Sequence, residues 1–211
     1  MTTAAMSWLD PQETIVAIAS PTSPAIRGVV RLSGDDVESI LNRMGIETGV
    51  RTSSDRSLRA RRFESEVDVG PPIGKVPLSV LWWPTKRSST GQPSAEFHTF
   101  GSLPLLTALV DAAVSSGARA ARPGEFTMRA FRAGRLDLTQ AVAVLGVIEA
   151  AQRGSRDHAL RQLAGNLSRP LESLRSDVLN LLADVEAGLD FVDEDIEFVS
   201  DQALEQRHSL I

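Results

Sequence analysis

Three charged residues, far apart in the chain, could together bind a small polar ligand. Arg31, Glu96 and Arg135 each lie at or near the end of an expected helix or strand. A carboxylate can accept paired hydrogen bonds from an amino-pyrimidinone edge, and arginine holds carboxylates in a fork. A pterin that carries a glutamate tail has both features. Taken singly, each of the three residues is more often a partner in a surface ion pair.

The run from Gly70 to Val76 contains a Gly-Lys pair but does not match a phosphate-binding loop. One residue too few separates its glycines, Val76 stands where a Ser or Thr would hold magnesium, and two prolines remove amide donors. No other segment has a nucleotide-binding fingerprint. We therefore expect no hydrolysis of GTP or ATP by these residues alone.

Metal and nucleophile chemistry have little support in the sequence. The absence of cysteine excludes disulfides, thiolate metal sites and a cysteine nucleophile. His98, His158 and His208 are far apart, so we interpret them as surface or packing histidines. The acidic run from Asp190 to Glu197 could hold a hard cation, but a solvated loop before a helix is the favoured interpretation. We expect no metal site and no catalytic residue.

The stretch from Pro123 to Gln140 separates two architectures. Pro-Gly marks a turn, residues 125–133 predict a short helix that ends at Gly134, and Asp137 begins a variant of the capping box. Strands and helices alternate before this stretch, whereas helix alone follows it. The predicted fold class is therefore α+β, an N-terminal mixed α/β domain followed by an all-α segment.

The apolar periodicity defines the elements within each part. The expected strands cover 13–20, 27–33, 58–69, 75–83, 95–100 and 118–122, and the expected helices of the mixed part cover 34–44 and 103–115. The charged strand over 58–69 is expected at a sheet edge. Residues 141–151 should be buried against other helices, and residues 171–189 come close to a heptad repeat. Pro170 should kink its helix or mark a new start.

Composition is that of an ordinary globular protein. The 211 residues are 42% hydrophobic and carry a net charge of −5, so nucleic-acid binding through overall charge is not expected. No apolar run approaches the roughly 20 residues that cross a bilayer. Residues 1–11 lack the features of a signal peptide. We expect a cytoplasmic protein without membrane association.

These residues and motifs resemble the MnmE (TrmE) family of tRNA modification GTPases. Residues 123–141 are similar to the family motif P-G-E-F-T/S-x-R-A-F-x-N-G/D-K-L-D-L-T/A-Q-A. Shorter segments similar to other family motifs follow the family's order, at 14–17, 31–34, 88–91, 163–168 and 190–196. The resemblance runs from about residue 13 to about residue 201.

The resemblance implies a ligand and partners. The family's N-terminal domain binds a tetrahydrofolate derivative (5-formyl- or 5,10-methylene-tetrahydrofolate) and forms a homodimer. A helical domain follows, into which a GTPase domain that uses GTP, potassium and magnesium is inserted. With a flavoprotein of the MnmG type, the family modifies C5 of the wobble uridine in tRNA. Its folate-contacting positions fall by motif on Arg31, Glu96 and Arg135, the last usually Lys in the family.

The resemblance also implies an organisation. The implied parts are a disordered N-terminus over 1–12, a folate-binding and dimerisation domain over 13–135, and the first part of the helical domain over 136–211. The chain is then truncated before the GTPase domain and the family's C-terminal Cys motif. Three loops depart from the family pattern, and family glycines are lost in two of them. They cover 23–26, 92–93 and 100–102.

The expected function is the folate-binding and dimerisation part of a tRNA wobble-uridine modification GTPase. The alternative is a non-catalytic dimerisation or interaction module whose folate pocket has decayed, with residues 171–189 as its surface. A third possibility, a folate-dependent one-carbon transfer enzyme acting alone, lacks a convincing base or nucleophile. If the chain is truncated, bare apolar faces over 141–151 and 171–189 predict poor solubility or oligomerisation.

Overall fold

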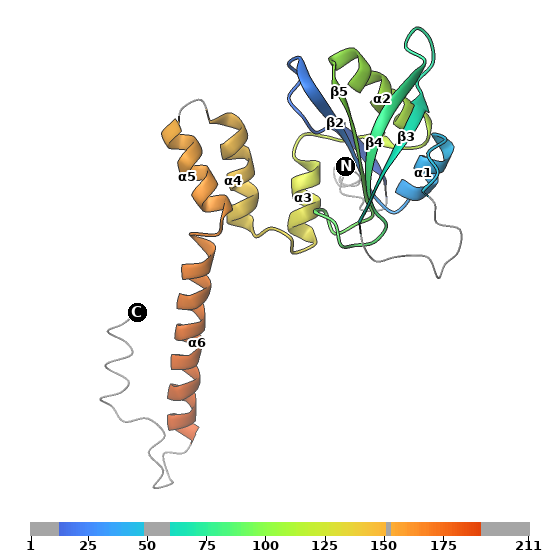
Figure 1. The fold of residues 1–211 in the computed structure, drawn as a ribbon. Helices are drawn as coiled ribbons and strands as arrows, with labels where there is room; N and C mark the ends of the chain where they lie inside the picture. Colours follow the sequence, from blue (N-terminus) through green and yellow to red (C-terminus); the bar gives the residue numbers. More distant parts are fainter. Residues whose placement is uncertain (1–12, 49–59, 151–152, 191–211) are drawn as a thin grey trace, which may run out of the picture. The chain divides into compact units, whose positions relative to one another are not determined.

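The structure is a computed structural model that describes residues 13–48, 60–150 and 153–190 (Figure 1). Three features of the sequence lie outside the described residues: the expected disordered N-terminus, the acidic run beyond its first residue Asp190, and His208. The chain divides into two compact units, Met1–Leu136 and Asp137–Ile211.

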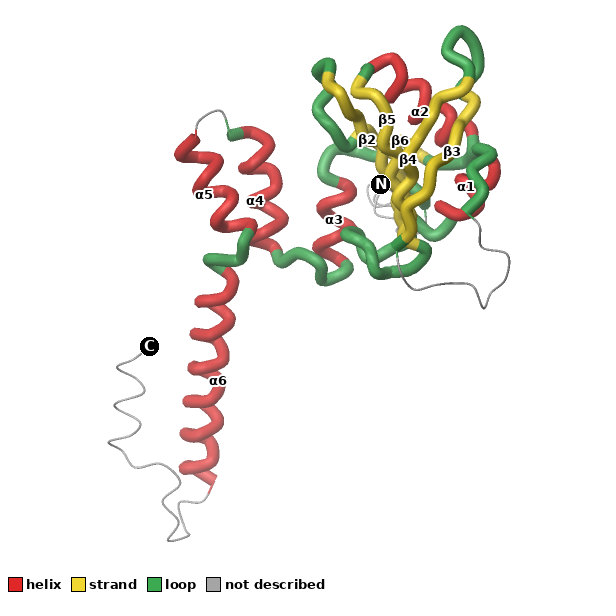
Figure 2. The backbone as a smooth tube through the Cα atoms, viewed as in Figure 1, coloured by secondary structure: helices red, strands yellow, loops and turns green. Residues whose placement is uncertain are grey.

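The first unit is built on one mixed sheet of six strands in the order β3-β4-β5-β2-β1-β6. Figure 2 draws the strands of this sheet in yellow. Neighbouring strands are antiparallel, except that β1 and β6 are parallel. The charged strand β3 lies at the edge, as predicted. The strands are β1 Ile15–Ile18, β2 Ala25–Ser33, β3 Arg61–Asp68, β4 Lys75–Trp83, β5 Ser94–Gly101 and β6 Arg119–Ala120.

The two faces of the sheet have different roles. Side chains alternate along a strand, so Val30 and Leu32 of β2 and Ala95 and Phe97 of β5 enter the core on one face. The residues between them, including Arg31, point to the other face. Helices α1 Val37–Arg43 and α2 Leu103–Ser115 contribute their apolar residues to the same core. The mixed α/β architecture agrees with the α+β prediction.

Helix α3, Glu125–Arg132, follows β6 and ends the first unit. Gly124 before it has a φ of 76°, and Gly134 after it has a φ of 66°. Both values lie in the left-handed region that glycine adopts without steric cost. The helix therefore has the glycine-bounded length that the sequence predicted, and Arg135 follows it directly.

The second unit consists of helices α4 Leu138–Glu149, α5 Arg153–Leu163 and α6 Ser168–Asp190. The predicted capping box forms, because Gln140 N–H donates to Asp137 Oδ1 at 2.8 Å and Asp137 N–H donates to Gln140 Oε1 at 3.0 Å. Pro170 lies in the first turn of α6, where its missing N–H costs no helical bond, so it marks a new start and not a kink.

The apolar surface of α4 is covered only in part. Ala143 is buried and lies on the side facing α5, where a Cβ at Gly146 would come within 3.2 Å of Ala159 Cβ. Val142, Leu145 and Ile148 remain 59%, 55% and 75% exposed. The expectation that this segment is buried is therefore wrong for most of its side chains within the described residues.

Candidate functional site

Arg31 and Glu96 are direct cross-strand neighbours on β2 and β5. The Nε and Nη2 groups of Arg31 each donate to Glu96 Oε1 at 2.8 Å. The side chains are 34% and 16% exposed, and both lie on the face of the sheet opposite the core. Because one carboxylate oxygen takes both guanidinium bonds, the second oxygen, Oε2, is left for another partner.

That partner is His98, a residue interpreted from the sequence as a surface or packing histidine. His98 Nε2 lies 3.0 Å from Glu96 Oε2. Residues two apart on a strand point to the same face, so the spacing Glu96-x-His98 was a usable signal for this contact. Arg31, Glu96 and His98 form a polar row that we call the sheet-face triad.

An aromatic ring from α3 lies against this triad. The Arg31 guanidinium carbon is 5.9 Å from the centre of the Phe126 ring. This distance is within the range of a cation–π interaction, which favours a fixed guanidinium over a freely rotating one. Helix α3 thus helps to hold the arginine that in turn holds Glu96.

Arg135 makes its hydrogen bond outside the triad. Its Nη2 group donates to the Lys86 carbonyl oxygen at 2.7 Å. Over the described ranges, no hydrogen bond or ion pair joins it to Arg31 or Glu96. The structure therefore brings two of the three predicted site residues together and connects the third to the segment between β4 and β5.

An open groove of about 450 Å³ begins at His98 and runs over the same face of the sheet. Arg62 crosses part of it and donates from Nε to Ser79 Oγ at 2.9 Å. The groove therefore combines guanidinium, hydroxyl and apolar groups next to the triad. Its walls are formed by Ile26, Arg27, Arg62, Glu64, Pro77, Leu78, Ser79, Leu81, His98, Thr99 and Phe100.

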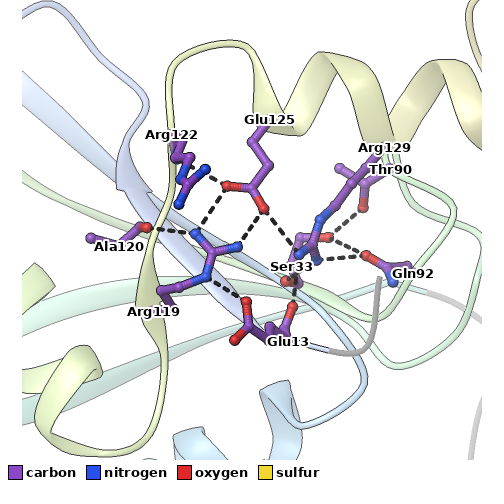
Figure 3. Close-up of polar contacts among 9 residues, drawn as sticks. All are labelled: Glu13, Ser33, Thr90, Gln92, Arg119, Ala120, Arg122, Glu125 and Arg129. Carbon is purple, nitrogen blue, oxygen red and sulfur yellow. Dashed lines mark hydrogen bonds and ion pairs between the residues drawn. The ribbon is translucent and has the colours of Figure 1, made fainter. Parts of the chain in front are cut away.

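A partly buried ionic network at the start of α3 was not predicted from the sequence (Figure 3). Arg119 donates to Glu125 Oε1 at 2.6 Å and to Glu13 Oε2 at 2.6 Å. Arg129 donates to the Ser33 carbonyl at 3.0 Å and to the Glu13 carbonyl at 2.8 Å. Glu125 and Arg129, spaced i and i+4 on the helix, were the available signal.

Burial and charge shift the pKa values of Glu125 and Arg129 in opposite directions. Burial alone would raise the pKa of Glu125, but hydrogen bonds from Arg119 and the Arg122 N–H outweigh it, and the pKa is lowered. Burial lowers the pKa of Arg129 against the attraction of Glu125. The Arg119 pKa is raised, chiefly by its hydrogen bond to Glu125. The Glu125 carboxylate therefore remains charged and holds the start of α3 beside Arg119 of β6.

The same network ties α3 to the segment before β5. Arg129 Nη1 donates to Gln92 Oε1 at 2.9 Å. Ser33 Oγ and Thr90 Oγ1, both buried, share a hydrogen bond of 2.6 Å. The altered residues 92–93 are thus accommodated, since the Pro93 carbonyl also accepts from Gly34 N–H at 3.0 Å.

The other two altered loops meet where β2 pairs with β5. A Cβ at Gly101 would come within 2.5 Å of the Ala25 carbonyl oxygen, so the two strands touch closely there. Ile26 and Phe100 are 90% and 64% exposed. The surface at these loops is therefore apolar where the family motif places glycine and histidine.

Two kinds of feature, a cluster of metal-ligating side chains and a helix that could span a membrane, are absent from the described residues. The described residues contain no group of three or more His, Asp or Glu side chains placed to hold a metal ion. Over the same residues, no helix combines the length and apolar character that a membrane span needs.

Comparison with known proteins gives consistent matches along the chain. Residues 14–135 match the family model described as "GTP-binding protein TrmE N-terminus", and residues 138–211 match the MnmE helical domain. The chain is similar to proteins named tRNA modification GTPase MnmE. It is 63% identical over 195 residues to that of Rhodopirellula baltica, with 92% of this chain and 41% of the relative aligned.

More distant relatives align over the same part. The identity is 41% over 188 residues with the MnmE of Thermus thermophilus, and 38% over 188 residues with that of Aquifex aeolicus. Each alignment covers 88% of this chain and 42% or 40% of the relative, so the chain spans about two fifths of the length of these relatives. The chain belongs to the MnmE (TrmE) family of tRNA modification GTPases and carries the family's N-terminal and helical domains.

Proposed function

We propose that this chain binds a reduced folate through Arg31, Glu96 and Arg135 and forms a homodimer through its N-terminal domain. It is then the folate-binding and dimerisation part of an enzyme that modifies C5 of the wobble uridine in tRNA. The observation that carries the proposal is the Glu96 carboxylate, held by two Arg31 donors on the open face of the sheet.

The chemistry of the ligand fits these groups. The pterin ring has adjacent N–H groups whose hydrogen bonds the Glu96 carboxylate can accept, and Arg31 holds that carboxylate in place. Arg135 is anchored on the Lys86 carbonyl by one nitrogen, and the other N–H groups of its guanidinium suit a carboxylate of the glutamate tail. The ligand class we favour is 5-formyl- or 5,10-methylene-tetrahydrofolate.

The remaining activities of the family are assigned to the complete enzyme. We propose that GTP, potassium and magnesium bind in the part of the family's sequences that this chain does not span. The MnmG-type flavoprotein and tRNA are proposed as partners of the complete enzyme. Residues 1–211 contain no phosphate-loop motif that would hold GTP.

Calorimetric titration with 5-formyltetrahydrofolate tests the folate proposal. Glu96→Gln should weaken binding by about 100-fold, because a charge-assisted pair of hydrogen bonds is lost. Glu66→Gln is the matched control, since Glu66 is an exposed carboxylate on β3 that does not line the groove. Absence of binding by the folded, unmodified chain at sub-millimolar ligand would overturn the proposal.

A second candidate is an interaction module without folate. The exposed side chains of Ile26 and Phe100, at altered family positions, favour it because they offer apolar contact area to another protein copy. This candidate predicts a dimer by light scattering whose mass and stability are unchanged by folate. A thermal stabilisation by 5-formyltetrahydrofolate that Glu96→Gln abolishes would exclude it.

A further inference from the structure

We propose that Phe126 of α3 is a positioning residue of the folate site, which acts on the ligand through Arg31 and Glu96. This inference rests on the proposed folate function and adds to its three charged residues an apolar one that need not touch the ligand. A chain of two contacts carries it. The Phe126 ring lies against the Arg31 guanidinium, and this guanidinium holds the Glu96 carboxylate.

The two contacts use different parts of the Arg31 side chain. The guanidinium carbon lies over the Phe126 ring, 5.9 Å from its centre. The Nε and Nη2 groups donate to Glu96 Oε1, both at 2.8 Å. A guanidinium over an aromatic ring still donates from the N–H groups at its edge, so both contacts form at once. The ring therefore limits where the guanidinium lies, and the guanidinium limits where the carboxylate lies.

Arg31 depends on such support because its surroundings are partly open. Its side chain is 34% exposed, whereas that of Glu96 is 16% exposed. A long and partly exposed arginine has several rotamers, and a single ion pair near the surface holds it weakly. A ligand that needs one orientation of Glu96 loses affinity when that orientation must first be selected. A ring that fixes Arg31 beforehand therefore strengthens binding without touching the ligand.

The helix that carries Phe126 is held next to Arg31. Phe126 and Arg129 are three residues apart on α3, so they are neighbours on the helix surface. Arg129 Nη1 donates at 3.0 Å to the carbonyl of Ser33, which follows Arg31 by two residues on β2. Glu125, directly before Phe126, accepts a 2.6 Å hydrogen bond from β6. Bonds on both sides of Phe126 in the helix therefore place its ring.

Calorimetric titration with 5-formyltetrahydrofolate tests the inference. Phe126→Leu should weaken binding by about fivefold, because leucine is apolar but offers no aromatic ring to the guanidinium. Phe126→Trp should restore the affinity to within about twofold, since tryptophan is the best cation–π partner. Phe131→Leu is the matched control on the same helix, where Phe131 is 42% exposed, and should bind as the unmodified chain does.

A second measurement needs no ligand. The Arg31 Nε–H group donates to Glu96 and should give its own NMR signal, which Arg31→Lys identifies by its loss. Phe126→Leu should broaden this signal through faster exchange with water, and Phe126→Trp should keep it. Phe126→Met also lacks the ring and should behave as Phe126→Leu does, so the result does not depend on the folding of one variant. Circular dichroism confirms that each variant is folded.

The outcomes separate this inference from the proposed function. Equal affinity of the unmodified chain and Phe126→Leu overturns the inference and leaves the folate proposal intact. The same holds if Phe126→Trp binds as weakly as Phe126→Leu, because the aromatic ring is then not what supports binding. An Arg31 signal that Phe126→Leu and Phe126→Met leave unchanged also overturns the inference alone. No binding by the folded, unmodified chain overturns both proposals, whatever the Arg31 signal does.

Discussion

Arg129 is enclosed by four acceptors from separate parts of the chain: two backbone carbonyls, the Gln92 amide and the Glu125 carboxylate. It is 6% exposed, so its charge is stabilised by these partners and not by water. The bonds reach the start of β1, the end of β2 and the segment before β5. A single side chain thereby fixes α3, and with it Phe126, beside Arg31.

Arg129→Met should lower the free energy of unfolding by about 3 kcal/mol, because it leaves buried carbonyls and a buried carboxylate with fewer partners. Urea unfolding monitored by tryptophan fluorescence measures the change, since Trp82 and Trp83 lie in β4. The control is Arg132→Met, an exposed arginine on the same helix. Equal effects of the two substitutions would show that the buried network does not stabilise the fold.

At the scale of elements, the end of α3 and the segment that leads into β5 pack so closely that an added methyl group does not fit between them. Gly91 has a φ of 71°, and a Cβ at this position would overlap Ala133 Cβ. Gly74, in the turn before β4, has a similar φ of 73° but open space where its Cβ would be. The two glycines thus share backbone strain and differ in packing.

Gly91→Ala should therefore destabilise the first unit more than Gly74→Ala. The left-handed backbone costs an alanine about 1 kcal/mol at either position, and overpacking adds about 1 to 3 kcal/mol at Gly91 alone. The difference between the two urea midpoints isolates the packing contribution. Identical midpoints would mean that α3 moves freely against the segment.

The N-terminal cap of α4 leads to a prediction about thermal stability at acidic pH. Hydrogen bonds from Thr139, Ser168 and the Gln140 N–H lower the pKa of Asp137 from 3.8 to about 2. A carboxyl group whose pKa is lower in the folded state stabilises that state above its unfolded pKa and loses the effect on protonation. Asp137→Asn should therefore lower the melting temperature of the helices at neutral pH.

This gap in melting temperature should narrow as the pH falls from 3.8 towards about 2, where the unmodified Asp137 becomes neutral as well. Melting followed by circular dichroism at 222 nm, an approximate measure of helix content, tests the expectation. Asp177→Asn on the exposed surface of α6 is the control. A gap that stays constant over this range would exclude the carboxylate as the source of the cap's stability.

The elements were largely predictable because local periodicity determines them. The ranges 75–83 and 103–115 coincide with β4 and α2, and the charged strand lies at the edge where its charges prevent further pairing. The triad was predictable only in part. Arg31 and Glu96 are 65 residues apart, and their pairing depends on strand register, which local sequence does not specify.

The Arg129 network depends on contacts between more distant segments. Its bonds to Ser33 and to the Glu13 carbonyl span 96 and 116 residues. The family motif indicated that residues 123–141 matter, but a motif does not tell which of its side chains stabilise the fold. The structure assigns Arg129 to the fold.

At the scale of the whole molecule, the exposed apolar side chains of α6 bear on how copies of the chain associate. Along α6, the side chains of Leu171, Leu174, Val178, Leu182 and Val185 are between 39% and 51% exposed. Their spacing of three and four residues places several of them along one side of the helix. A surface of this kind favours association with another apolar surface in water.

The chain on its own should therefore form assemblies larger than a dimer at micromolar concentration. Leu174→Lys with Leu182→Lys should reduce the mass measured by light scattering, because two charges interrupt the apolar surface of α6. Ser173→Lys with Asn180→Lys adds the same charge at exposed polar positions of the same helix and should leave the mass unchanged. If neither pair changes the mass, association occurs elsewhere, and the exposed residues Ile26 and Phe100 of the first unit become the next surface to test. A monodisperse monomer of the unmodified chain would contradict both the α6 prediction and the proposed homodimer.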